Sequence, residues 1–264
     1  MADPPIVVKL GGSVVTRKRQ AERLRPKVLE RLGTELADPP TPGLIVLHGA
    51  GSFGHPGARR FGLARAPADP AEARARDRGG AIVAREVRRL HNEVLRALID
   101  AGAPAYSVPA HLHARNREGQ LAAFDEGPFV RALAAGWVPV SFGDVVPDEV
   151  WGQSILSADT LALELGRRLH ARRVVFVSDV PGILRSPEPG PPRIFARWTR
   201  GDLPGLRGGP GAPDVTGGIR RKAEVMVALA EAGVPAGLVS GLVPGAARRA
   251  LRDEPPPFGT WALP

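Results

Sequence analysis

Two glycine-rich segments that carry a lysine or a histidine are the parts of this sequence best suited to chemistry. The first is Lys-Leu-Gly-Gly-Ser at residues 9–13, and the second is His-Gly-Ala-Gly-Ser-Phe-Gly-His at residues 48–55. Glycines let backbone amides approach a phosphate because no Cβ stands in the way. Lys9 and Ser13 add a cation and a hydroxyl group, and the imidazole of His55 can hydrogen-bond a phosphate oxygen. Neither segment is a Walker A loop or a dinucleotide fingerprint.

Two further segments supply an acid and another lysine. Ser-Phe-Gly-Asp at residues 141–144 is followed by Ser-Ala-Asp at residues 157–159, where the serine is expected to cap a helix. Asp159 then lies in the first turn of that helix, either for the helix dipole alone or to hold two lysines by charge pairing. In residues 214–222, two glycines precede a helix, and Lys222 should point back from its first turn toward the same site.

The lysines are rare and unevenly placed. They are Lys9, Lys18, Lys27 and Lys222, and all other members of the 36 basic residues are arginines. Positions that keep a compact ammonium group in such an arginine-rich chain are candidates for chemistry. Three of the four lie in the glycine-rich motifs, whereas Lys27 does not and shows that chance retention also occurs.

Composition excludes several classes of protein. The chain has no cysteine, so disulfides, thiolate metal sites and cysteine nucleophiles are impossible. It has neither a signal-peptide pattern at its start nor a run of about 18 apolar residues. The net charge of +9 is spread along the chain rather than gathered in one tract, and aromatic residues are few. We therefore expect a cytoplasmic protein with no membrane or nucleic-acid partner, and salt-sensitive DNA binding would test the latter.

Apolar runs alternate with helical patterns along the chain. The runs rich in β-branched residues are 6–8, 44–47, 138–140 and 174–177, and the helical patterns are 81–99, 157–169 and 219–232. Continuous hydrophobicity is typical of strands covered on both faces, as in a parallel sheet. The alternation predicts an α/β fold, a three-layer αβα sandwich around a mainly parallel open sheet. Residues 186–192 and 203–213 are predicted loops, and we expect a single domain over residues 1–264.

The four motifs together resemble the amino-acid kinase superfamily. They follow that family's order and span residues 9–222. Within the superfamily, Gly-x-Gly-Ser-Phe-Gly-His, Gly-Gly-Ser-Val-Val-Thr-Arg-Lys and Asp-Val-Thr-Gly-Gly are similar to isopentenyl phosphate kinases. Acetylglutamate, aspartate and uridylate kinases have no histidine at the place of His55. Two positions depart from the family pattern, since Ala50 replaces a common glycine and Ala158 replaces the glycine of Ser-Gly-Asp.

The resemblance implies an activity and a set of site residues. ATP, with Mg²⁺ bridged by ATP oxygens and water, would phosphorylate isopentenyl phosphate in isoprenoid biosynthesis, and the protein would be a homodimer. The implied catalytic residues are Lys9, Lys18, Asp159 and Lys222. The implied substrate-binding residues are Ala50, Ser52, Gly54, His55 and Gly143. The implied ATP-binding residues are Lys9, Leu10, Gly11, Gly12, Ser13, Gly51, Asp179, Gly182, Gly217, Gly218 and Lys222.

The resemblance also divides the chain into halves and leaves rivals open. Residues up to about 150 would form the acceptor-phosphate side, and residues from about 151 onward the ATP side. Candidates for an apolar pocket are the helix at 81–99, Phe61 and Val108. One rival is a kinase of another small phosphate or phosphonate, such as fosfomycin. Another is a non-catalytic protein of this fold that binds nucleotide or oxyanion, although such a protein needs no lysine at the transfer point.

Overall fold

The main sheet of the molecule contains seven strands. We describe it from a computed structural model, which covers residues 3–17, 20–38, 40–185, 193–205, 218–252 and 258–264. The strand order is β13-β12-β9-β1-β2-β6-β3, and every neighbouring pair is parallel except β12 with β13. The strands are β1 (Ile6–Leu10), β2 (Leu44–His48), β3 (Ala105–Ser107), β6 (Val138–Phe142), β9 (Arg173–Ser178), β12 (Ala236–Ser240) and β13 (Thr260–Ala262). The predicted mainly parallel sheet is confirmed.

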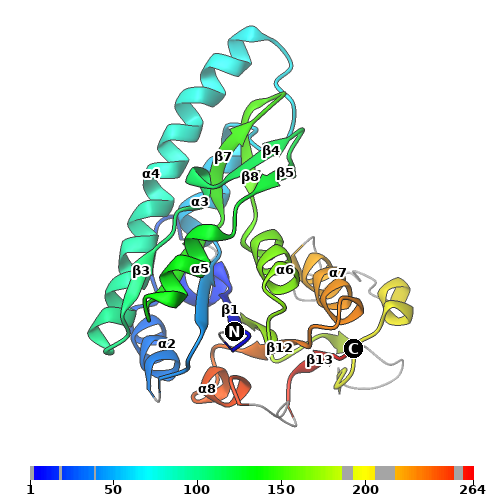
Figure 1. The fold of residues 1–264 in the computed structure, drawn as a ribbon. Helices are drawn as coiled ribbons and strands as arrows, with labels where there is room; N and C mark the ends of the chain where they lie inside the picture. Colours follow the sequence, from blue (N-terminus) through cyan, green and yellow to red (C-terminus); the bar gives the residue numbers. More distant parts are fainter. Residues whose placement is uncertain (1–2, 18–19, 39, 186–192, 206–217, 253–257) are drawn as a thin grey trace.

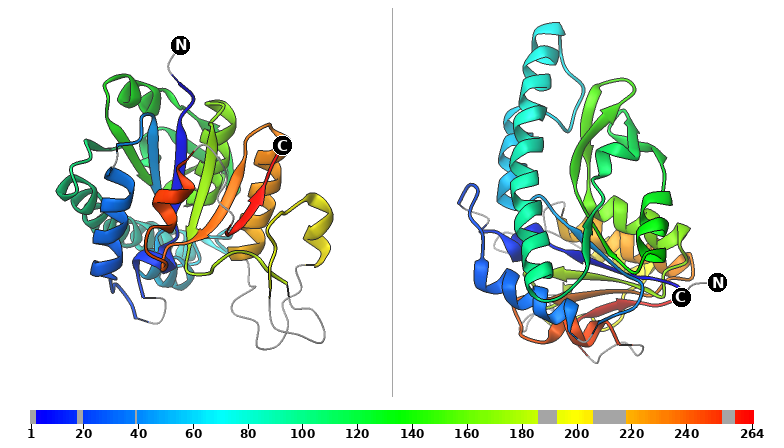
Figure 2. Two further views of the ribbon diagram at one scale, coloured as in Figure 1. Left: turned by 90° about the horizontal axis from the view of Figure 1, so that it is seen from below. Right: turned by 60° about the vertical axis from the view of Figure 1, so that its left-hand side comes forward.

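Helices cover both faces of this sheet, as Figures 1 and 2 show. They are α1 (Gly12–Val15), α2 (Pro26–Ala37), α3 (Gly51–Arg60), α4 (Pro70–Asp100), α5 (Gly127–Ala134), α6 (Ala158–Arg168), α7 (Gly218–Glu231), α8 (Ala246–Ala250) and the 3₁₀ helices η1 (Ala110–Leu112) and η2 (Arg200–Gly205). The three predicted helices are present as α4, α6 and α7. Helix α4 begins eleven residues earlier than the predicted 81, because Asp69 caps it by accepting a hydrogen bond from the Glu72 amide and Pro70 starts its first turn.

Each face of the sheet has its own hydrophobic core. On one face, Val7 and Phe176 pack with Leu161 of α6 and Met226 of α7. On the other face, alternate residues of the same strands pack against α2, α4 and α8. Fully burying one such aliphatic side chain contributes about 1.5–3 kcal/mol. Because both faces are covered, the central strands are mostly apolar, as the sequence predicted, and their polar residues Lys9, His48, Arg173 and Ser178 lie at or next to the strand ends.

A second sheet of four strands, which the sequence did not predict, stands beside the N-terminal half of α4 (Figure 1). Its order is β5-β4-β7-β8, from β4 (Ala114–Arg117), β5 (Gln120–Phe124), β7 (Asp144–Asp148) and β8 (Gly152–Leu156). A small antiparallel pair, β10 (Leu184–Arg185) and β11 (Arg193–Ile194), flanks the predicted loop at 186–192, which lies outside the described residues. The other predicted loop overlaps η2 up to Gly205 and then leaves the described residues. Among the described residues, the helices are all too short or too polar to cross a membrane.

Candidate active site

The loops that follow the central parallel strands meet along one edge of the main sheet. The Gly11 amide donates to the Val177 carbonyl at 2.7 Å, and the Gly49 amide donates to the Leu10 carbonyl at 2.9 Å. The Gly143 amide in turn donates to the His48 carbonyl at 3.0 Å. Each loop is thereby tied to the end of its neighbouring strand. The glycine-rich segments at 9–13 and 48–55 and the segment at 141–144 are therefore adjacent in space, at the edge where parallel α/β sheets bind ligands.

A buried carboxylate holds two lysines at this edge. Lys9 Nζ lies 2.8 Å from Asp159 Oδ1, and Lys222 Nζ lies 3.3 Å from Asp159 Oδ2. The three side chains are between 6% and 13% exposed, and they come from β1, α6 and α7. Ser157 caps α6 by accepting a hydrogen bond from the Thr160 amide at 3.0 Å, which fixes Asp159 in the first turn. Lys222 also donates to the Gly218 carbonyl at 3.1 Å, so it points back to the start of α7 as predicted.

The ionisation of this cluster follows from its burial and its charges. Burial alone would raise the pKa of Asp159, but Lys9 and Lys222 outweigh it and hold that pKa below its ordinary value. Burial, followed by repulsion from Lys9, lowers the pKa of Lys222, while Asp159 and Asp179 oppose the change. Two cations share one buried anion, so the cluster carries net positive charge that suits a phosphate ligand.

The close approach of the first two glycine-rich loops requires glycine. A Cβ on Gly12 would collide with the backbone of Gly51, and a Cβ on Gly49 would crowd the amide of Gly12. Gly51 has a φ of +50°, which favours glycine, and its missing Cβ makes room for Thr16. Thr16 donates to the Gly12 carbonyl at 2.6 Å and accepts from the Ser52 amide at 3.0 Å. Thr16, which the sequence did not single out, therefore joins α1 to α3.

The described residues that were predicted to bind ATP lie at the ends of β1 and β9, before or at the start of α3 and α7, and beside β13. Ser13 donates to Asp179 Oδ1 at 2.8 Å across the ends of β1 and β9. Leu10 is a core residue and offers only its backbone. Gly182 is buried against Thr260 and Ile194, and Gly218 stands in open space at the start of α7. The predicted site residues Lys18 and Gly217 lie outside the described residues.

The residues predicted to bind the acceptor gather on α3 and its neighbouring loops. His55 is exposed on α3, and the pKa of its imidazole is lowered by desolvation and then by repulsion from Lys9, Arg59 and Lys222. His55 is thus close enough to sense both lysines of the cluster. Gly54 is buried and packs so closely that a Cβ there would clash with Ala50 and Val87.

Two other predicted acceptor positions take up structural contacts. The Ser52 hydroxyl accepts from the Arg23 amide at 3.3 Å and so faces the loop after α1. Gly143 is buried where the main sheet passes into β7, and a Cβ there would crowd the amide of Ala158. Both residues lie beside the site and shape its backbone.

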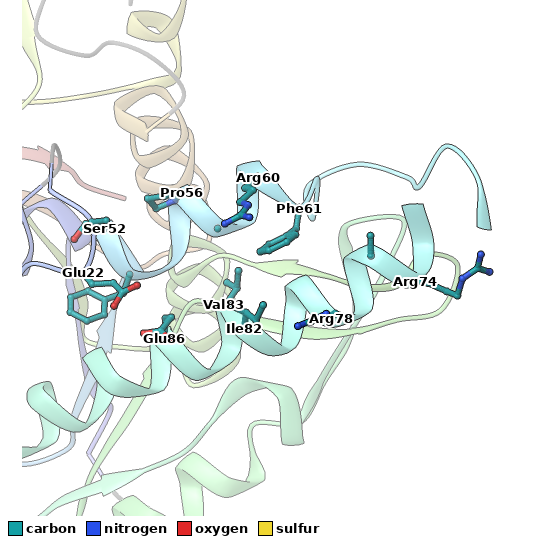
Figure 3. A pocket seen from close by; sticks show the side chains of 14 residues that line it. Glu22, Ser52, Pro56, Arg60, Phe61, Arg74, Arg78, Ile82, Val83 and Glu86 are labelled. Carbon is teal, nitrogen blue, oxygen red and sulfur yellow. The ribbon is translucent and has the colours of Figure 1, made fainter. Parts of the chain in front are cut away.

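Apolar side chains lie next to this acceptor side. Leu63, Val83, Val87, Phe142 and Val145 form a buried cluster, and Ala50, Phe61 and Ile155 pack against it. A groove of about 700 Å³ runs between α3 and α4, and Figure 3 shows Phe61 turned from α3 toward Val83 of α4. Arg60 and Arg78 stand at its rim. Phe61 and the helix at 81–99 are therefore together as predicted, but Val108 belongs to the core on the other side, with Ala110 and Phe129.

Several buried polar residues near the acceptor loops received no structural role in the sequence analysis. His48 Nε2 lies 3.1 Å from His91 Nδ1 of α4. Asp144 Oδ2 lies 3.0 Å from His111 Nδ1 and 3.4 Å from Arg88 Nη2, and burial raises the pKa of Asp144 despite these neighbours. His91 sits inside a predicted helix and offered no local signal, whereas His48 and Asp144 lay within motifs that the sequence did flag.

A parallel sheet whose glycine-rich loops gather two lysines around a buried aspartate defines a phosphotransferase of the amino-acid kinase type. Comparisons with known proteins agree. The model of the amino acid kinase family matches residues 4–240, so the chain belongs to that family.

The relatives of the chain show which subfamily of the amino acid kinase family it belongs to. The isopentenyl phosphate kinase of Methanothermobacter thermautotrophicus is 34% identical over 255 residues, which cover 94% of this chain and 96% of that protein. The isopentenyl phosphate kinase of Haloferax volcanii is 35% identical over 234 residues, covering 88% and 89%. A solved structure of isopentenyl phosphate kinase superposes with a TM-score of 0.85 at 32% identity, covering 98% of this chain and 99% of that one. Within the family, the chain is a member of the isopentenyl phosphate kinases.

Proposed function

We propose that this protein transfers the γ-phosphoryl group of ATP to the phosphate of isopentenyl phosphate, giving isopentenyl diphosphate and ADP. The observation that carries the proposal is the pair of lysines on Asp159, set between two glycine-rich loops with His55 beside them. The relatives named above add the identity of the acceptor. A phosphate acceptor is already ionised near neutral pH, so the reaction needs no strong general base.

The chemical task is to bring two anions together. Phosphoryl transfer depends on positioning and on neutralising charge more than on covalent catalysis. In this proposal Lys9 and Lys222 bind ATP phosphates, and Asp159 keeps both ammonium groups oriented. Lys18 stabilises the transferring phosphoryl group. Preorganised cations and amides of this kind are usually the largest contribution to catalysis.

The two halves of the site divide the substrates. ATP lies on the side of β9, α6 and α7, and its proposed partners are Gly11, Gly12, Ser13, Gly51, Asp179, Gly182, Gly217 and Gly218, with Leu10 contributing backbone. The acceptor phosphate lies at the start of α3, against the amide of Ala50 and near Gly54 and Gly143. The Gly54 amide itself donates to the Ala50 carbonyl at 3.2 Å, so Gly54 contributes a close approach of the backbone rather than a free donor. Ser52 acts by holding the loop after α1.

His55 is the proposed ligand of the acceptor phosphate. Its imidazole has a lowered pKa in the free protein, so it is neutral at pH 7 and donates one hydrogen bond. A bound phosphate dianion would raise that pKa again, because an opposite charge favours the protonated ring. Binding of the acceptor is therefore coupled to uptake of a proton.

The apolar surface beside His55 suits a branched hydrocarbon chain. Val83 belongs to the buried cluster and Phe61 packs against it, and both residues line the groove between α3 and α4. We place the five-carbon chain along these two residues. A small polar acceptor would leave this surface unused, which favours isopentenyl phosphate over the fosfomycin-like alternative.

Magnesium would be held mainly by ATP. Within the described ranges, His, Asp and Glu side chains form no group of three that could hold a metal ion. Asp159 is engaged by two lysines, and Asp179 accepts from Ser13. Mg²⁺ keeps several waters and binds through substrate phosphates, so this donor set fits an ion carried in with the nucleotide. When bound, it would offset charge on the β- and γ-phosphates.

We further propose that the protein is a homodimer that pairs along β3. Strand β3 is the edge of the main sheet, and edge strands present unpaired backbone groups. Tyr106 of β3 stacks on Trp137, and Ile99 of α4 and Val130 of α5 are also exposed; these four residues, here called the edge patch, are between 43% and 54% exposed. A cytoplasmic location is the remaining proposal and fits a chain without cysteine.

The proposed function is tested by a coupled ADP-release assay with MgATP. Isopentenyl phosphate, dimethylallyl phosphate and fosfomycin are compared as acceptors, in wild type and in His55→Ala and Lys18→Ala variants. We expect the highest kcat/KM with isopentenyl phosphate, and a loss of more than about tenfold in each variant, equivalent to about 1.4 kcal/mol. Lys27→Ala, which removes an exposed lysine outside the motifs, is the matched control and should change little. Turnover of fosfomycin alone would contradict the proposal.

A further inference from the structure

A chain of hydrogen-bonding groups lies buried behind the acceptor loop. His48 Nδ1 is 3.3 Å from the Gly49 carbonyl oxygen, and His48 Nε2 is 3.1 Å from His91 Nδ1. His91 Nε2 is 2.7 Å from Ser107 Oγ. Both histidines are almost completely buried, at 0% and 3% exposure. This series of hydrogen bonds therefore connects β3, through α4, to Gly49 in the loop between β2 and α3.

The direction of the hydrogen bonds follows from the end of the chain at Gly49. A carbonyl oxygen only accepts, so His48 supplies it with a donor only when its Nδ1 carries the proton. The Nε2 of His48 is then an acceptor, and His91 must donate from its own Nδ1. The Nε2 of His91 accepts from the Ser107 hydroxyl. One arrangement of protons thus satisfies every group, with both rings in the Nδ1–H tautomer.

His48 also ties the second acceptor loop to the first. Its backbone carbonyl accepts from the Gly143 amide at 3.0 Å, while its ring donates to Gly49. The ring of Phe142 packs against both imidazoles, with centroid distances of 5.4 Å to His48 and 4.3 Å to His91. A shift of His48 would therefore move both loops that flank the acceptor phosphate.

The surroundings keep both rings neutral, as this proton arrangement requires. Burial, assisted by Lys9 and opposed by the bond to Gly49, lowers the pKa of His48 to about 4. Burial, followed by the proximity of His48 and Arg88, lowers the pKa of His91 to about 2. A charged His48 would place its Nε2–H against the Nδ1–H of His91, so that two donors faced each other.

We propose that His91 is a positioning residue for the acceptor: acting through His48, it fixes the carbonyl of Gly49 and the two loops that bind the acceptor phosphate. The inference rests on the proposed function, because the loops concerned are those assigned to the acceptor. It adds a role for three residues, His48, His91 and Ser107, that do not touch either substrate. The ATP side is held separately, by Asp159 and by the contact between Ser13 and Asp179.

The test compares two replacements of His91 that differ in one donor. In His91→Asn the side-chain amide can donate to His48 Nε2 as Nδ1 does, whereas His91→Leu removes the donor. We expect His91→Leu to raise the KM for isopentenyl phosphate, and its Kd measured by calorimetry without ATP, by about tenfold. The KM for ATP should stay within about twofold, and His91→Asn should restore most of the acceptor affinity. Equal losses in both variants, or an equal rise in the KM for ATP, would overturn the proposal.

A second measurement does not depend on turnover. Nitrogen-15 NMR of the wild-type protein should show both buried imidazoles neutral and protonated at Nδ1 from pH 7 down to about pH 5. Imidazoles protonated at Nε2 would overturn the hydrogen-bond chain whatever the activity. A wild-type protein that neither binds nor phosphorylates isopentenyl phosphate would instead reject the proposed substrate. In that case, the affinity of the same two His91 variants for inorganic phosphate decides whether the hydrogen-bonded histidines position the phosphate-binding loops.

Discussion

Asp159 is the residue on which the arrangement of charge in the site depends. It is a buried anion that contacts two buried cations, and burial alone would favour its neutral form. Removing one partner of a buried ion pair typically costs about 3–5 kcal/mol, because the remaining charge stays desolvated. Here the remaining charges are two ammonium groups, which would repel each other. The carboxylate therefore holds the lysines together as well as orienting them.

The variant Asp159→Asn tests whether the carboxylate serves to orient the two lysines or to support nucleotide binding. We expect kcat to fall by more than about tenfold, because Lys9 and Lys222 lose the anion that orients them. The KM for ATP should not rise, since loss of a negative charge makes the pocket more attractive to polyphosphate. The pKa of Lys222 should fall further in the variant, because in the wild type the Asp159 carboxylate raises that pKa. Steady-state kinetics with ATP and acceptor varied separately checks this pattern.

A carboxylate outside the site is the control for this variant. Asp202 accepts from Thr199 at the start of η2, and Asp202→Asn should leave kcat unchanged. A rise in the KM for ATP of tenfold or more in Asp159→Asn would show that the aspartate supports nucleotide binding rather than lysine orientation.

The lysine cluster could be predicted from the sequence because its parts carry local signals. Lys9 follows a buried strand and precedes two glycines, Asp159 follows a helix cap, and Lys222 follows the glycines of another helix start. The histidine chain could not be predicted. His48 and His91 are 43 residues apart, and His91 occupies a helical position that a core residue would fill equally well. Only the fold brings their rings together.

At the scale of elements, the second sheet is the part of the fold that sequence patterns missed. Strand β4 reads Ala-Arg-Asn-Arg and β8 reads Gly-Gln-Ser-Ile-Leu, so neither has the continuous hydrophobicity that identified the central strands. Each strand still contributes a buried apolar residue to the core, and a buried carboxylate joins the turns of the sheet. Asp148 accepts hydrogen bonds from four backbone amides and one hydroxyl, which are Glu118 N, Gly119 N, Val150 N, Trp151 N and Ser154 Oγ at 2.7–3.1 Å. It thereby joins the turn between β4 and β5 to the turn between β7 and β8.

The pKa of Asp148 gives a prediction for this sheet. Burial would raise that pKa, but the amides of Trp151 and Gly119, with the hydroxyl of Ser154, lower it well below the ordinary value. A lowered pKa in the folded state means that the stabilisation is complete above the unfolded pKa of about 3.9 and is lost as the pH falls through the folded value. Asp148→Asn should reduce the free energy of unfolding by about 1–3 kcal/mol at pH 7. The difference from wild type should shrink below about pH 4.

Denaturant unfolding at a series of pH values makes this measurement, and the neighbouring residue supplies the control. Glu149 pairs with Arg115 and Arg117 on the surface, where such pairs contribute about 0–1 kcal/mol. Glu149→Gln should therefore change stability little at any pH. A difference between Asp148→Asn and wild type that persisted unchanged at pH 3 would contradict the assignment of the stabilisation to the ionised carboxylate.

At the scale of the whole molecule, the sequence predicted the layers of the fold but not the edge strands of the main sheet. The central strands β1, β2 and β9 are buried along their full length, and their composition follows from that burial. Strand β3 has three residues and a half-exposed, exposed, half-exposed pattern, so its composition carries no comparable signal. Its Tyr106 stacks on Trp137 with ring centroids 4.4 Å apart, a contact that only the folded structure reveals.

The edge strand β3 is where we propose that a second copy of the chain pairs. Two copies related by a two-fold axis can continue the sheet through β3, because the same edge is presented by both and pairs with itself. The edge patch would be buried on either side of the strand. We therefore expect light scattering after size-exclusion chromatography to give the mass of two chains for wild type. The double variant Tyr106→Lys and Trp137→Glu should give the mass of one, because it places charges at the centre of the contact. Val150→Glu alters an equally exposed apolar residue in the turn between β7 and β8 of the second sheet and should remain dimeric. A monomeric wild type, or a dimer that survives the double variant, would place any self-association elsewhere on the surface.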